Sequence, residues 1–145
     1  MLYLPDANIL IYAKMTGMAE HMAARDWLSA TLNDSNSTLL VCETSVLAFL
    51  RITTNPKAFN PPLPYTDAVS FTTDLLTRKN VRIPKPSTGH FIEVAEFMKE
   101  NALGGNLVMG IHLAILAMNT GSVLVSRDKD FLKIPHLRLL DPFMV

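Results

Sequence analysis

Hydrophobic and polar positions alternate along the chain between short apolar runs and longer stretches with helical spacing. The runs that predict buried strands are residues 2–4, 37–42, 81–83 and 122–126, with a last short one at 137–140. The stretches that predict helices are residues 8–15, 18–33, 43–54, 66–78, 87–101 and 107–120. Because strands alternate with helices, we predict an α/β fold with a parallel sheet covered by helices on both faces.

Proline, glycine and capping residues set the predicted helix boundaries. Asn55-Pro56 ends the third helix and Gly121 ends the sixth. The proline-rich stretch 55–67 predicts a structured loop between helices, and Thr66-Asp67 is a capping signal for the helix that follows. In the second helix, the large apolar residues predicted to share one side are Met18, Met22, Trp27 and Leu28.

Length and composition narrow the class of protein. A chain of 145 residues predicts one domain, residues 1–145. Lys plus Arg equals Asp plus Glu at 13 each, so the net charge does not indicate a nucleic-acid binder, although a local basic patch fits within a neutral total. No run predicts a membrane span or a signal peptide. The one cysteine, Cys42, has no internal disulfide partner, so we expect a cytoplasmic protein with Cys42 as a core residue.

Three of the predicted strands are each followed by an acidic residue. Asp6 follows the first with Asn8 two positions later, Glu43 follows the second, and Asp128 follows residues 122–126. Because the carboxyl ends of parallel strands meet at one edge of a sheet, we expect these carboxylates to converge. Crowded carboxylates resist joint ionisation, and a hard cation such as Mg²⁺ offsets their repulsion. Such a site can activate water and stabilise a phosphodiester under attack.

Taken singly, the same acids have simpler explanations. Asp6 directly before ANIL is a good helix N-cap. Glu43 is an acid in the first turn of a helix, where it complements the helix dipole. Asp128 and Asp130 are typical turn residues. The joint pattern of three strand ends favours a shared site, and both roles stay open for Asp6.

Four motifs occur in order over nearly the whole chain: PDANILIYA, VLAFLRITTNPKAF, GGNLVMGIHLAILAMNTG, and VLVSRDKDF followed by IPHLRLLDP. In these motifs the sequence resembles the PIN-domain ribonucleases, and within them the VapC-type toxins of bacterial toxin–antitoxin pairs. The resemblance implies a PIN-like single domain with a mainly parallel sheet. It also implies a metal-dependent endoribonuclease that binds Mg²⁺ or Mn²⁺ through acidic residues and cleaves single-stranded RNA.

The resemblance also implies roles for individual residues. Asp6 and Asp128 match catalytic metal ligands, and Glu43 matches an outer ligand or water-orienting base, unless the second acid lies deeper in its helix, where Ala48 has replaced it. The residues implied around these ligands are Asn8, Asn106, Ser126 and Asp130. The cations implied to hold RNA are Lys14, Arg51 and Arg127. For Arg51, a pairing with a carboxylate of the cluster is an equal alternative.

Gly110 departs from the family pattern. That pattern resembles GNLVxDAHLAALA, whereas this chain reads GNLVMGIHLAILA, so Gly110 stands where an acidic ligand is expected. Glycine inside a helix also costs about 1 kcal/mol relative to alanine. Either the natural protein has lost this acid, or the glycine was introduced or selected because an active RNA-cutting toxin is hard to produce; we favour the second explanation. In both cases we expect impaired activity.

The resemblance implies partners as well: a small antitoxin that covers the acidic site, and a second copy in a homodimer. The main alternative function is a catalytically inactive PIN-like module that binds RNA or protein, which Gly110 supports. An Asp-nucleophile phosphatase fits less well because Asn8 stands where its second acid belongs. The four histidines lack metal-ligand spacing, and His112 on an apolar helix is interpreted as a core or interface group.

Overall fold

Five short parallel strands form the centre of the molecule. The structure, a computed structural model, describes residues 1–144. The strands are β1 (Leu2–Pro5), β2 (Thr38–Leu40), β3 (Val81–Arg82), β4 (Val123–Val125) and β5 (Leu139–Leu140). They lie in the order β3-β2-β1-β4-β5, and every neighbouring pair is parallel. The predicted α/β fold with a parallel sheet is therefore confirmed.

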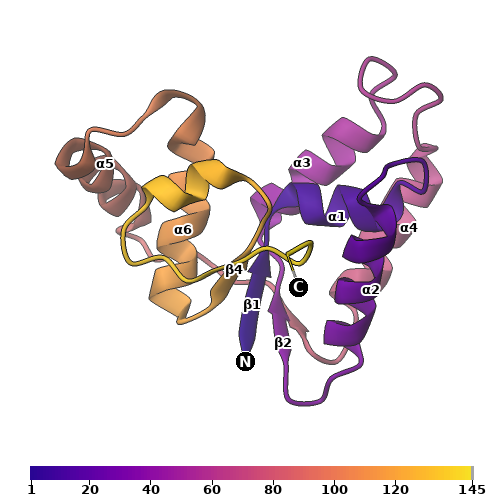
Figure 1. The fold of residues 1–145 in the computed structure, drawn as a ribbon, viewed down its shortest axis with the longest axis horizontal. Helices are drawn as coiled ribbons and strands as arrows, with labels where there is room; N and C mark the ends of the chain where they lie inside the picture. Colours follow the sequence, from indigo (N-terminus) through magenta and orange to yellow (C-terminus); the bar gives the residue numbers. More distant parts are fainter. Residues whose placement is uncertain (145) are drawn as a thin grey trace.

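Helices cover both faces of this sheet (Figure 1). The α-helices are α1 (Ala7–Lys14), α2 (His21–Leu32), α3 (Glu43–Thr53), α4 (Tyr65–Leu76), α5 (His90–Asn101) and α6 (Val108–Thr120). Two short 3₁₀ helices, η1 (Gly105–Leu107) and η2 (Lys129–Lys133), precede α6 and follow β4. No helix within residues 1–144 combines the length and apolar character that crossing a bilayer requires.

The alternation of side chains along the strands divides the interior into two cores. Leu39 and Val41 pack with the helices α1 to α4, whereas Leu40 and Cys42 pack with α5 and α6. Successive strand residues point to opposite faces, which is why neighbours in this short run enter different cores. Cys42 is a free thiol, 2% exposed, as the sequence analysis expected.

The order of the strands creates one special position between β1 and β4. From β1 the chain moves to β2 and β3 on one side, and then returns to β4 and β5 on the other. In open α/β sheets, ligands bind beyond the carboxyl ends of the strands where the order reverses in this way. Asp6 directly follows β1, and Ser126 to Asp128 follow β4, so both acids flank this point.

Several predicted boundaries and contacts were wrong. The helix predicted at 18–33 begins at His21, whose Nδ1 lies 2.9 Å from the carbonyl oxygen of Tyr12. This contact turns His21 inward and its neighbour Met22 outward, so Met22 is 56% exposed and not part of the buried side. Thr66-Asp67 does not cap α4, because the proline-rich segment ends at Pro64 and both residues lie inside the first turn.

Candidate functional site

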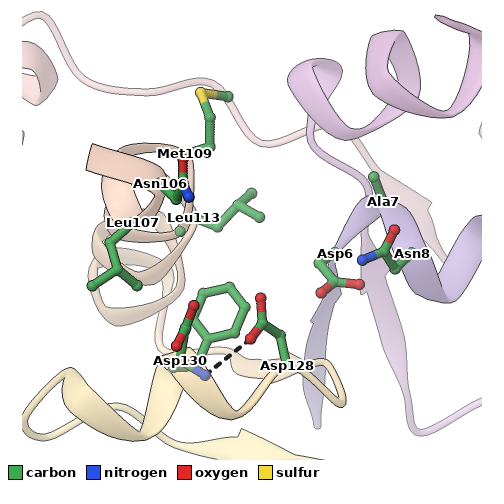
Figure 2. Close-up of a pocket in the computed structure, with 11 residues that line it drawn as sticks. Asp6, Ala7, Asn8, Asn106, Leu107, Met109, Leu113, Asp128 and Asp130 are labelled. Atoms are coloured by element: carbon green, nitrogen blue, oxygen red, sulfur yellow. Dashed lines mark hydrogen bonds between the residues drawn. The ribbon is translucent and has the colours of Figure 1, made fainter. Parts of the chain in front are cut away.

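A pocket of about 190 Å³ opens at the carboxyl ends of β1 and β4. One wall comes from the start of α1, the floor from the segment after β4, and the other wall from η1 and α6. Figure 2 shows Asp6 and Asn8 on one side, Asn106, Met109 and Leu113 across the opening, and Asp128 and Asp130 at the bottom, with Asp130 below the second group. The lining residues are Asp6, Ala7, Asn8, Asn106, Leu107, Met109, Gly110, Leu113, Asp128, Asp130 and Phe131.

Asp6 is the buried acid of this pocket. Its backbone N–H donates to the carbonyl of Val125, which fixes the end of β1 against β4. One carboxylate oxygen accepts from the N–H of Ile9 at 3.1 Å and caps α1, and the other accepts from the hydroxyl of Ser126. Burial raises the pKa of Asp6 from 3.8 to about 6, opposed by the hydrogen bonds from Ser126 and Ile9, and the charge of Asp128 raises it further. Asp6 therefore combines a capping role with a carboxylate that gains a proton easily.

Ser126 connects the two acids. It is 1% exposed at the end of β4, and its hydroxyl donates to Asp6 while accepting from the N–H of Asp128 at 3.0 Å. Asp128 is more exposed, and its carboxylate accepts from the N–H of Asp130 at 2.9 Å, which begins η2. The turn after β4 is thereby held so that Asp128 faces the same opening as Asp6 (Figure 2).

The wall opposite Asp6 is largely apolar where α6 passes the pocket. At Gly110 an added Cβ would lie 3.2 Å from Cε1 of Phe131, so the buried Phe131 ring partly fills the space beside the glycine. An acidic side chain at this position requires the ring to move by a few tenths of an ångström. Leu107, Met109 and Leu113 complete this wall, and Asn106 is its polar member.

Comparison with protein families gives a direct result. The family described as PIN domain matches residues 3–137. The chain belongs to the PIN domain family. The matched range runs from Tyr3 in β1 through η2 and so includes every residue that lines the pocket.

Relatives of this PIN domain chain carry a consistent name. Ribonuclease VapC33 of Mycobacterium tuberculosis is 27% identical over 139 residues, covering 96% of each chain. Ribonuclease VapC37 of the same organism is 31% identical over 137 residues, covering 94% of each chain. The solved structure of VapBC2 from Rickettsia felis, bound to a DNA fragment from their promoter, has the same fold, with a TM-score of 0.70 at 17% identity over 97% of this chain and 98% of that one. The predicted membership of the VapC-type PIN domains is confirmed.

The structure does not bring Glu43 into the pocket of this PIN domain. Glu43 begins α3 after β2, on the far side of β1 from β4, and lies in a separate hollow with Leu47, Ile83 and Lys85. Glu43 follows β2, which pairs with β1 on the side away from β4, and its side chain does not line the pocket. Ala48, one turn further along α3, does not line the pocket either.

The three cations predicted to hold RNA lie in different surroundings. Lys14, in the last turn of α1, lines a hollow with Leu28 and Arg78 away from the acids. Arg51 is exposed in the last turn of α3 and forms no ion pair with any carboxylate in residues 1–144, so its alternative pairing with the acidic cluster is wrong. Arg127 precedes Asp128 directly and pairs with Glu20, with Nη1 3.2 Å from Oε2.

The donor atoms around the pocket fit a hard cation. Asp6 and Asp128 offer carboxylates, and Asn8 and Asn106 offer amide oxygens. Mg²⁺ is commonly bound through one or two protein carboxylates while it keeps several waters. Within the part of the chain that the structure describes, no group of three or more acidic, histidine or cysteine side chains is placed to hold a metal. The donor set therefore fits a site with few protein ligands, because Gly110 supplies no acid and Glu43 lies outside the pocket.

A second polar cluster was not predicted from the sequence. Nε2 of His90 lies 2.7 Å from Nδ1 of His112, and Nε2 of His112 lies 3.0 Å from the hydroxyl of Thr44, which in turn lies 3.1 Å from Sγ of Cys42. Burial lowers the pKa of both imidazoles, and the His112 charge lowers that of His90 further. This chain of contacts ties α5, α6 and α3 together, and both ring nitrogens of the half-buried His112 have partners, as expected for a satisfied core or interface group.

Proposed function

We propose that this chain is a VapC-type ribonuclease toxin that cleaves single-stranded RNA by metal-assisted phosphodiester hydrolysis with Mg²⁺ or Mn²⁺. One observation carries the proposal: Asp6 and Asp128 meet in a pocket at the point where the strand order reverses. The names of the two mycobacterial relatives support the same reaction class.

Asp6 and Asp128 are the residues proposed to hold the ion, with Asn8 and Asn106 beside them. When bound, the ion supplies positive charge that stabilises a phosphodiester under attack and favours a water nucleophile. The protein contributes orientation, because Ser126 and the N–H of Ile9 fix both oxygens of Asp6, and the N–H of Asp130 fixes Asp128. Because the pKa of Asp6 is about 6, protons compete with the cation, and we expect metal affinity to rise with pH through this value.

Gly110 lowers the cleavage activity that we expect of this chain. The expected acid is absent from the α6 wall, and the Phe131 ring occupies part of its place. We propose that the chain cleaves RNA weakly or not at all, and that its fold retains the rest of the site. The same observation favours a second candidate function, a PIN-like module that binds RNA or protein without cleavage.

The proposed partners follow from the relatives. The Rickettsia felis structure contains VapBC2 bound to promoter DNA. By analogy we propose that this chain pairs with an antitoxin that covers the acidic pocket, that it forms a homodimer, and that it acts in the cytoplasm.

The test is RNA cleavage with Mg²⁺ or Mn²⁺, comparing the chain with its Gly110→Asp form and with that form carrying Asp6→Ala. Ribonuclease toxin function predicts that Gly110→Asp cleaves and that the added Asp6→Ala abolishes cleavage. A circular dichroism melt of each form excludes misfolding, since the Phe131 ring has to move. If the Gly110→Asp form is folded and binds Mn²⁺ but leaves a broad panel of RNAs intact, the binding-module function replaces the enzyme.

A further inference from the structure

The guanidinium of Arg127 lies over an aromatic ring. Its Cζ is 4.8 Å from the centroid of the Phe143 ring, and Phe143 meets Tyr12 edge-on with ring centroids 5.9 Å apart. These three residues come from the turn after β4, the C-terminal segment and α1. They form one continuous cluster of π surface, which we call the Arg127 stack.

The Arg127 stack lies near the acidic pocket, although none of its three residues lines it. Arg127 stands between Ser126 and Asp128, the two residues that organise the end of β4. Tyr12 follows Asn8 by four residues on α1, so the two side chains share a helix face, roughly one turn apart. Burial raises the pKa of Tyr12, and the charges of Glu20 and Asp6 raise it further, as expected for a ring on the side of α1 that faces the acids. A substrate held at Asp6 and Asp128 therefore passes close to this cluster.

The charge of Arg127 is already compensated. Its guanidinium pairs with Glu20 at 3.2 Å, so it attracts a phosphate less than a free cation does. Phe143 supplies the one cation–π contact of Arg127 within residues 1–144, and the Arg127 side chain remains 46% exposed. Proteins that bind single-stranded RNA stack bases on aromatic rings and on arginine guanidinium planes. The guanidinium plane of Arg127, packed on Phe143 and still partly exposed, is therefore suited to stack with a nucleobase.

We propose that the Arg127 stack is a base-stacking subsite, in which Arg127, supported by Phe143 and Tyr12, receives an unpaired nucleobase next to the phosphate held at the acidic pocket. This assignment rests on the proposed function, because it takes single-stranded RNA to be the ligand. It gives a more specific role to Arg127, which the resemblance to PIN-domain ribonucleases implied to be one of the cations that hold RNA. Stacking does not depend on base identity, so the subsite positions RNA without fixing a cleavage sequence.

The test measures binding of a short fluorescein-labelled single-stranded RNA by fluorescence anisotropy, with EDTA present so that no strand is cut. Arg127→Lys keeps the positive charge but removes the planar guanidinium group. Phe143→Leu removes the aromatic ring that supports it, and Phe143→Tyr keeps an aromatic ring there. Arg25→Lys is the matched control, since Arg25 is 51% exposed, pairs with Asp26 at 3.1 Å and makes no cation–π contact within residues 1–144. The second probe is the same RNA lacking one base, with the gap moved along the strand.

The expected result is a loss of about 5- to 150-fold in affinity for Arg127→Lys and Phe143→Leu, with Phe143→Tyr and Arg25→Lys unchanged. The salt dependence of binding should stay the same in Arg127→Lys, because its charge is retained. Removing one particular base from the RNA should lower the affinity of the unmodified protein by a similar factor, and should hardly change the affinity of the Arg127→Lys protein. A melting curve shows whether Phe143→Leu remains folded, and Arg127→Lys tests the same stack from its exposed side.

Three results would overturn the inference. If Arg127→Lys binds as tightly as the unmodified protein while Arg127→Ala binds more weakly with a shallower salt dependence, Arg127 contacts phosphate and not a base. If none of the stack variants changes binding, the subsite does not exist, and cleavage by the Gly110→Asp form would still uphold the proposed function. If no form binds RNA and the Gly110→Asp form does not cleave, both proposals fail together.

Discussion

Replacing Asp6 by asparagine should make the metal-free protein more stable at neutral pH, although it removes a proposed metal ligand. Burial raises the pKa of Asp6 from 3.8 to about 6. A raised carboxyl pKa means that the folded state holds the proton more tightly than the unfolded state. Between these two values stability falls as pH rises, and above about pH 7 the full cost of the ionised group is present.

The size of the effect follows from the same shift. About two pKa units at 1.36 kcal/mol each give a cost of about 3 kcal/mol for the ionised Asp6 at neutral pH. Asparagine carries no charge and caps helices as well as aspartate. Its amide oxygen can accept from the N–H of Ile9, and its amide group can donate to the hydroxyl of Ser126. We therefore expect Asp6→Asn to gain about 1–3 kcal/mol at pH 8 and almost nothing near pH 4.

The assay is urea unfolding of both proteins with EDTA at a series of pH values. Burial lowers the pKa of His90 and of His112, but both residues are present in both proteins, so their contribution cancels in the difference. Adding Mg²⁺ should then stabilise the unmodified protein more than Asp6→Asn, because only the former keeps the carboxylate. A difference that does not change with pH, or an Asp6→Asn protein that is less stable at pH 8, would refute the reasoning.

Three further changes test local packing by equilibrium unfolding. Gly110→Ala should raise the free energy of unfolding by less than the roughly 1 kcal/mol expected from helix propensity, because its Cβ meets Phe131 at 3.2 Å. The full gain should appear when Phe131 is also changed to leucine. Equal gains with and without Phe131→Leu would show that the contact is unimportant. Thr44→Val should cost about 1–2 kcal/mol by removing the 3.0 Å hydrogen bond to His112, and an unchanged midpoint would mean that this bond does not contribute. Gly121→Ala should cost about 1 kcal/mol because φ is 68° at the end of α6, and a neutral result would contradict that conformation.

The sequence predicted the elements of the fold because each has a local cause. Apolar runs marked the strands, and helical spacing marked the helices between them. Boundaries that depend on tertiary contacts were missed, as at Met22, where the contact between His21 and Tyr12 decides which side of α2 is buried. The cap predicted at Thr66-Asp67 failed because Pro64 already starts the helix.

The candidate site was predictable in part for the same reason. That Asp6 and Asp128 each follow a strand is visible in the sequence, and parallel strands bring such ends to one edge. The order of the strands is not visible, and it is this order that places Glu43 beyond β1 and outside the pocket. The contacts of Arg127 with Glu20 and Phe143 join residues far apart in the chain, so no spacing rule indicates them. The same holds for the pair of His90 and His112.

The brevity of the outermost strands limits how another protein can attach to this one. β3 and β5 are the edge strands of the sheet, and each has only two residues. Each is followed two residues after its end by a proline, Pro84 and Pro142, which lacks the N–H that a ladder needs. Short edge strands that are followed closely by proline disfavour the addition of a strand from another protein to the sheet. An antitoxin or a second copy is thus expected to bind through side chains of helices and loops, and sheet-to-sheet aggregation should be disfavoured.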